Sequence, residues 1–133
     1  MSKYQRSLNR YMRSSKYTNN YQVGRTKIYL IKVIFASAVL CMIDGFTTQI
    51  LVNNHGAMAE YNVIIRALME YTDNNVLEIK LWFAITVYPI LMGIIVIWKN
   101  VSRDKLRALA LAFNILNALQ AVAILMAISL ITM

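Results

Sequence analysis

The sequence contains few of the residues from which small domains build covalent cross-links, metal sites or tight turns. Among 133 residues there are one cysteine, one histidine, one proline and four glycines. A single cysteine excludes a disulfide within the chain and a metal site built from several cysteines. The scarcity of glycine and proline excludes collagen-like and glycine- or proline-rich low-complexity sequence. Only 15% of the residues are charged, which argues against a disordered chain or a highly charged coiled coil.

Apolar and basic residues are abundant instead. The chain is 59% hydrophobic, and fourteen Lys and Arg against six Asp and Glu give a net charge of +8. This combination is typical of a membrane protein with basic flanks. Long apolar runs predict three transmembrane helices, at about 28–52, 77–98 and 106–131. An apolar stripe at helical spacing predicts a short amphipathic surface helix at about 57–71. The fold class expected is an all-α integral membrane protein.

Residues 1–27 form a basic segment that precedes the membrane domain, residues 28–133. The segment has no acidic residue, and its seven cations are Lys3, Arg6, Arg10, Arg13, Lys16, Arg25 and Lys27. The first connection has one Lys or Arg (Arg66), the second has four, and none follows the third span. The positive-inside rule then predicts a multi-pass protein of the cell membrane, with the N-terminus cytoplasmic and the C-terminus outside. We expect the seven cations to contact anionic lipid headgroups, in preference to nucleic acid.

The first span carries an acidic residue well inside its apolar run. Asp44 lies about 16 Å along the helix from Val33, and an ionisable residue at such a depth needs a partner or a water-filled cavity. Thr48 lies one turn further on, and Lys80 in the second span is the nearest cation in depth. Two interpretations stay open: a structural Asp44–Lys80 pair that ties two helices together, or a small outward-facing polar site.

The third span is rich in alanine and carries a stripe of polar side chains. Asn114, Asn117 and Gln120 follow at steps of three, so they share one helix face. Such side chains form hydrogen bonds between membrane helices, and small residues allow close packing. Because three helices are too few to enclose a transport pathway within one chain, we expect a homo-oligomer or a subunit of a membrane complex.

Motifs for catalysis are missing from the sequence. It contains no Gly-x-Ser-x-Gly, no phosphate-binding loop and no HExxH motif. Cys41 and His55 are too far apart along the chain to be expected as a dyad, and the carboxylates near His55 have no spacing specific to a metal. We therefore expect no catalytic residue, no metal and no cofactor, and favour a protein that is not an enzyme.

One set of residues resembles a known family. Asp44-Gly-Phe-Thr-Thr48 is followed by Gly56-Ala-Met-Ala-Glu60-Tyr-Asn62 and then by Lys80 in the next span. This is similar to a family of small bacterial and archaeal membrane proteins of unknown function. Their pattern is Asp-x-x-x-Thr in one span, Gly-x-x-x-Glu-x-Asn-Pro in the next loop, and a basic residue in the following helix. The resemblance covers about residues 40–98 and departs at Val63, where the family usually has proline.

The resemblance implies that five residues belong to one site: Asp44, Thr48, Glu60, Asn62 and Lys80. It implies no activity. The favoured function is a non-enzymatic subunit or scaffold of a membrane complex, with the basic tail on the inner membrane surface. The alternatives are an enzyme or ligand-binding protein that uses the outer polar cluster, and a holin-like pore-former.

Overall fold

The computed structural model describes residues 1–56, 60 and 62–133, and all regular structure in these residues is helical. The elements in chain order are α1 (Lys3–His55), α2 (Val63–Thr72), α3 (Val76–Trp82), the π-helical turn η2 (Phe83–Val87), α4 (Tyr88–Ile97) and α5 (Arg103–Thr132). Three stretches are long and apolar enough to cross a membrane: one within α1, the continuous arm Val76–Ile97, and α5. The all-helical prediction and the number of candidate spans are confirmed for the described residues.

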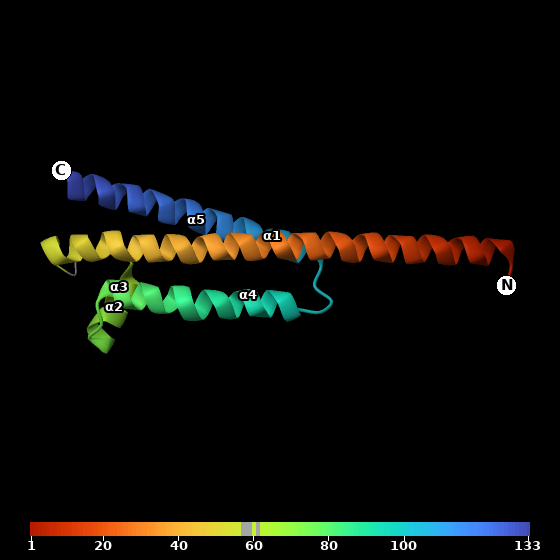
Figure 1. Ribbon diagram of the computed structural model, residues 1–133, viewed down its shortest axis with the longest axis horizontal. Coiled ribbons are helices and arrows are strands. Elements are labelled where there is room, and N and C mark those ends of the chain that lie inside the picture. The colour runs from red at the N-terminus through yellow and green to blue at the C-terminus, as the bar shows by residue number, and fades with distance from the viewer. Residues whose placement is uncertain (57–59, 61) are drawn as a thin grey trace.

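Helix α1 runs the whole length of the molecule (Figure 1). Its 53 residues extend about 80 Å at 1.5 Å per residue. Ser2 caps the start in a capping box with Gln5, which satisfies two backbone N–H groups that the first turn leaves free. Residues 1–27 differ from the first apolar span in composition, but in the structure they continue its axis. Residues 1–21 are exposed along their whole length.

The arrangement is a bundle in which α1 contacts both of the other long helical arms. The arm formed by α3, η2 and α4 runs antiparallel to α1, and α5 runs parallel to it (Figure 1). Most inter-helix packing involves α1, whereas α4 and α5 hardly touch each other within the described chain. The main apolar core lies where the three arms meet, and its residues are Leu30, Ile34, Ala38, Cys41, Ala84, Tyr88, Ile95, Val101, Leu106 and Ala110.

The surface helix predicted at about 57–71 corresponds to α2, which begins at Val63 and ends at Thr72. Two residues of the predicted stripe, Ala57 and Tyr61, lie outside the described residues. Asn62 begins the helix, because its side-chain oxygen accepts from the N–H groups of Ile64 and Ile65 at 3.0 and 3.3 Å. Asn62 therefore acts first as a helix cap.

The second arm changes its helical pitch just before its proline. In η2 the N–H of Tyr88 donates to the carbonyl of Phe83, five residues earlier, and Pro89 follows in the first turn of α4. A proline ring collides with the carbonyl four residues before it and cannot donate a hydrogen bond. A π-helical turn relieves this conflict by moving the hydrogen bonds by one residue. The helix therefore continues past Pro89 and widens locally just before it.

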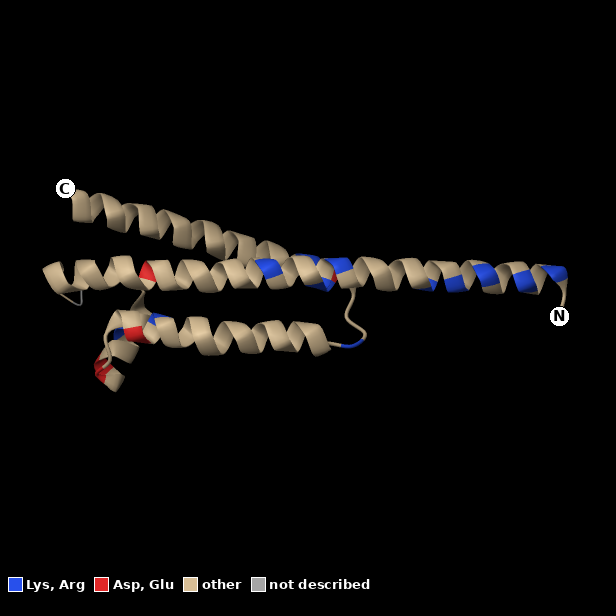
Figure 2. Cartoon of the chain, in the orientation of Figure 1, with Lys and Arg blue, Asp and Glu red and all other residues tan. Residues whose placement is uncertain are grey.

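Charges of the two signs gather at different ends of the molecule (Figure 2). The N-terminal half of α1, the connection between α4 and α5, and the start of α5 carry most of the Lys and Arg. Asp and Glu lie mainly at the other end, on α1, α2 and α3. This separation brings the one deeply placed lysine, Lys80, to the acidic end.

Candidate functional site

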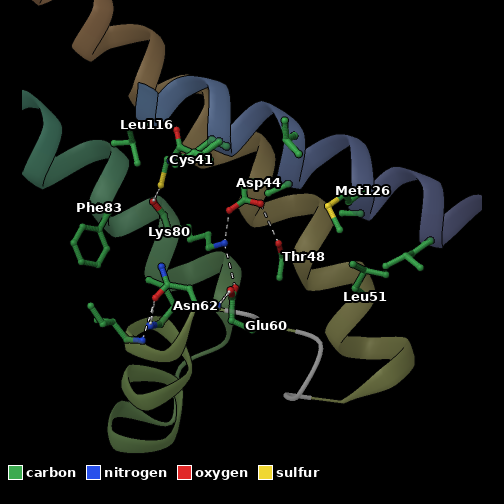
Figure 3. Close-up of a pocket in the computed structure, with 18 of the residues that line it drawn as sticks. Cys41, Asp44, Thr48, Leu51, Glu60, Asn62, Lys80, Phe83, Leu116 and Met126 are labelled. Atoms are coloured by element: carbon green, nitrogen blue, oxygen red, sulfur yellow. Dashed lines mark hydrogen bonds and ion pairs between the residues drawn. The ribbon is translucent and has the colours of Figure 1, made fainter. Parts of the chain in front are cut away.

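A pocket of about 760 Å³ lies beside α1 at the end of the bundle where α2 and α3 begin. Figure 3 shows the charged side chains gathered on one side of the pocket and apolar side chains of α5 on the other. The polar lining consists of Asp44, Thr48, Glu60, Asn62, Lys80 and Gln120. The polar lining thus brings together all five residues that the resemblance groups into one site, together with Gln120 of the third span.

Lys80 occupies the centre of the polar cluster. Its Nζ forms an ion pair with Asp44 Oδ2 on α1 and a second one with Glu60 Oε2 at 3.2 Å (Figure 3). The residue is 6% exposed and Glu60 is 4% exposed. Glu60 is buried and Asp44 partly buried, and these two carboxylates on one buried ammonium leave the trio with a formal charge of −1. The sequence suggested an Asp44–Lys80 pair, and the structure adds Glu60 as a second carboxylate on the same lysine.

The start of α3 fixes the position of Lys80. Asn75 and Glu78 form a capping box at the first turn, which determines where the helix begins. The N–H of Leu77 donates to Gln49 Oε1 of α1 at 3.3 Å. This contact places the start of α3 beside Gln49. Asp44 then lies five residues, or about 7.5 Å, along α1 from that level, a depth that the side chain of Lys80 reaches from the last turn of α3.

Gly45 allows α3 to lie directly against α1. A Cβ atom at this position would come within 3.1 Å of Lys80 Cβ and 3.4 Å of Leu77 Cδ1. Sequence reasoning missed this residue. The available signal was a row of small side chains at four-residue spacing, Ser37, Cys41 and Gly45, all three of which are buried. Such a row is typical of a close helix–helix contact in membrane proteins.

Hydrogen bonds orient both carboxylates of the cluster. Thr48 Oγ1 donates to Asp44 Oδ1 at 3.2 Å, while the other oxygen of Asp44 faces Lys80. The N–H of Asn62 donates to Glu60 Oε1 at 2.8 Å, so the turn before α2 holds Glu60 in place. Val63 is the first residue of α2, and the first helical position is one that proline occupies readily. The departure from the family pattern at Val63 therefore leaves this turn compatible with the cluster.

The polar stripe of α5 divides between two roles. Asn117 accepts from the Ser37 hydroxyl and donates through Nδ2 to the carbonyl of Val33 at 3.3 Å. Asn114 donates to Tyr29 Oη at 3.1 Å near the surface. Gln120 lines the pocket, and its buried Oε1 has no hydrogen-bond partner among the described residues.

Replacing Asn117 by leucine should weaken the packing of α5 against α1. The change removes two hydrogen bonds between α5 and α1 from a half-buried contact, at a cost of about 1 kcal/mol, while the Ser37 hydroxyl keeps its bond to the Val33 carbonyl at 3.1 Å. Unfolding in mixed maltoside–dodecyl sulfate micelles, followed by circular dichroism, measures this loss. The control is Asn114→Leu, whose exposed bond to Tyr29 contributes less. Equal losses in the two variants would contradict the role given to Asn117.

The cations of the N-terminal segment lie away from this cluster. Lys3, Arg6, Arg10, Arg13 and Lys16 are exposed on the free part of α1. Lys27 Nζ donates to the carbonyl of Trp98 at 2.6 Å, which connects α1 to the end of the second arm. Arg25 lies near the start of α5, beside a second pocket.

Comparison with known proteins gives no match: no family model, no curated protein and no solved structure is significantly similar to this chain. The resemblance over residues 40–98 stays a prediction. The function proposed below is therefore based on the geometry of the Lys80, Asp44 and Glu60 cluster.

Proposed function

We propose that this chain is an integral membrane protein that binds, without catalysis, an amphiphilic molecule in the pocket beside α1. The observation that carries the proposal is the buried cluster of Lys80, Asp44 and Glu60 on the wall of a pocket whose opposite wall is apolar. The apolar wall belongs to α5 and consists of Leu116, Leu119, Val122, Ala123, Met126, Ala127 and Leu130. A volume of about 760 Å³ lies within the usual range of ligand pockets.

The orientation in the membrane is part of the proposal. The clustered cations in Figure 2 support a cytoplasmic N-terminus by the positive-inside rule. The Lys80 cluster then lies in the outer half of the membrane. A ligand would enter with its polar end at the cluster and its hydrocarbon along α5.

The net negative charge of the cluster favours a ligand whose polar end is a cation. Asp44, Glu60 and Lys80 sum to −1, and an ammonium group would bring the site to neutrality. Gln120 Oε1 adds a carbonyl that has no donor among the described residues, and a buried acceptor without a donor costs free energy. The ligand class proposed is therefore an amine that carries a single hydrocarbon chain.

Dodecylamine is a suitable probe, with dodecanol and dodecanoate as chain-matched controls. We expect dodecylamine to bind as a saturable single ligand, in native mass spectra recorded from maltoside micelles, and dodecanoate to bind at least about tenfold more weakly. Glu60→Gln keeps the Asp44–Lys80 pair but neutralises the cluster, so this variant should lose about tenfold in dodecylamine affinity.

The matched control is Glu70→Gln, which removes the same charge from an exposed position of α2 and should leave dodecylamine binding unchanged. Equal binding of dodecylamine and dodecanoate would overturn the proposal. So would an equal loss of affinity in the two Glu→Gln variants.

A second candidate is the subunit or scaffold role favoured by the sequence. The observation in its favour is that most of α5 is exposed although it is apolar: Leu111, Ile115, Leu119, Val122 and Leu125 are each more than half exposed. A partner helix would cover this face in place of lipid. The same native spectra separate the candidates, because a dimer or larger assembly without bound dodecylamine supports the subunit role.

A further inference from the structure

A second pocket, of about 660 Å³, lies at the opposite end of the bundle between α1 and the start of α5. Its lining residues are Thr18, Tyr21, Gln22, Arg25, Thr26 and Tyr29 from α1, and Arg103 and Arg107 from α5. Three of these eight residues are arginines, and none is acidic. The pocket is therefore a concentrated positive site, formed by two helices that are far apart in the sequence.

No carboxylate among the described residues neutralises these arginines. The buried carboxylates of the Lys80 cluster lie at the other end of the bundle. Asp104 is next to Arg103 in sequence, but it is exposed and forms no ion pair with Arg25, Arg103 or Arg107. An anion in the pocket would meet no negative side chain among its lining residues.

Arg103 is held in place by one hydrogen bond and has a second N–H group without a partner among the described residues. Arg103 Nη1 donates to Gln22 Oε1 at 2.9 Å, which fixes the guanidinium against α1. Its Nε is buried and has no hydrogen-bond partner among the described residues. A guanidinium with two N–H groups in one plane matches two oxygens of a phosphate. This property of the guanidinium group favours a phosphate over a simple halide ion.

Aromatic side chains complete the pocket. The guanidinium of Arg25 lies 6.0 Å from the centre of the Tyr21 ring, a distance at which the cation and the ring attract. Tyr29 Oη accepts from Asn114, so its own O–H proton is available to an anion. The Arg25 guanidinium and the Tyr29 hydroxyl can therefore both donate to an anion in the pocket.

The pocket lies at the level where apolar sequence begins. Lys27, two residues after Arg25, contacts the carbonyl of Trp98 at the end of the second arm. Tryptophan and basic residues are typical of the interface between the membrane core and the headgroups. A pocket at this level is within reach of a phosphate carried by a lipid.

We propose that Arg25, Arg103 and Arg107 form a binding site for a phosphate group, supplied by an anionic phospholipid of the inner leaflet. The site is independent of the Lys80 cluster. It differs from diffuse attraction of the basic segment to a charged surface, because two arginines come from α5 and the phosphate would join α1 to α5.

Dioleoyl phosphatidic acid, dioleoylglycerol and inorganic phosphate separate the possible sources of the phosphate. We expect phosphatidic acid to bind the full-length protein as one saturable ligand in native mass spectra, and dioleoylglycerol, which has the same chains without the phosphate, to show no saturable binding. Weak binding of inorganic phosphate assigns the site to a lipid. Phosphate binding as tight as that of phosphatidic acid would overturn the lipid assignment.

The decisive comparison uses two double variants of equal charge. Arg103→Gln with Arg107→Gln should lower the affinity for phosphatidic acid by at least about tenfold, since the change removes two of the three cations that would contact the phosphate. Arg6→Gln with Arg10→Gln removes the same charge from the exposed part of α1 and should change the affinity less than about twofold. Equal losses would overturn the site in favour of diffuse attraction.

Arg25→Gln gives a second test, because Arg25 is exposed and stacks over the neighbouring Tyr21 ring, so the fold should tolerate its loss. We expect this variant to keep its helical circular dichroism and to lose several-fold in affinity. Unchanged affinity for phosphatidic acid in the folded variant would remove Arg25 from the site and contradict the proposal.

Discussion

Replacing Lys80 by methionine is expected to destabilise the protein more than any other single substitution in the polar cluster. Methionine keeps most of the side-chain volume but leaves the partly buried Asp44 and the buried Glu60 near each other without a cation. Removing one partner of a buried ion pair costs about 3–5 kcal/mol, and in this cluster two like charges are left behind. The measurement is the free energy of unfolding in maltoside–dodecyl sulfate micelles, followed by circular dichroism.

The companion variants show whether charge is the cause. Asp44→Asn leaves Lys80 paired with Glu60 and should cost clearly less than Lys80→Met. Neutralising both carboxylates in the Lys80→Met background, with Asp44→Asn and Glu60→Gln, should recover most of the lost stability. Lys105→Met is the matched control at an exposed position. Equal stability of Lys80→Met and Lys105→Met would rule out the buried cluster as described.

The second large effect is expected from Gly45→Leu. A leucine at this position would push α3 away from α1, because even a Cβ atom would lie 3.1 Å from Lys80 Cβ. Overpacking a close contact of this kind costs about 1–3 kcal/mol. The displacement would also separate Lys80 from Asp44, so the variant should lose dodecylamine binding together with stability.

Gly93→Leu provides the control for that experiment. A Cβ atom at Gly93 has nothing within 4 Å, and both glycines lie inside helices, so the two changes share the same gain in helix propensity. We expect Gly93→Leu to retain stability and dodecylamine binding. Similar losses in the two leucine variants would show that the effect does not arise from the contact between α1 and α3.

The sequence predicted the helical arms well because hydrophobic runs of membrane length have few other interpretations. Predicted spans at about 28–52, 77–98 and 106–131 correspond to part of α1, to Val76–Ile97, and to α5. The helical continuity of residues 1–27 with the first span was not predicted. A polar, basic segment has no core-forming stripe, and its helix depends on backbone propensity and on its connection to a long helix.

The residues that form the site could be predicted from the sequence, but their contacts could not. Asp44 and Lys80 were paired from their depth, and Glu60 and Asn62 entered through the resemblance. Three features needed coordinates: the second ion pair of Lys80, the capping role of Asn62, and the close approach at Gly45. The ion pairs of Lys80 and the contact at Gly45 depend on which face of α1 meets α3, and the apolar pattern of a membrane helix does not reveal that face, since lipid and protein neighbours are both apolar. The cap at Asn62 depends only on where α2 begins.

The continuity of α1 has a mechanical consequence. Both pockets are lined by this one helix, and the part that precedes its contact with Arg103 at Gln22, Lys3–Tyr21, is exposed and about 28 Å long. Tilting α1 by about 10° at the level of Gln22 moves the tip of this straight segment sideways by about 5 Å. Small changes in the packing of α3 or α5 against α1 are thereby magnified at the far end of the chain.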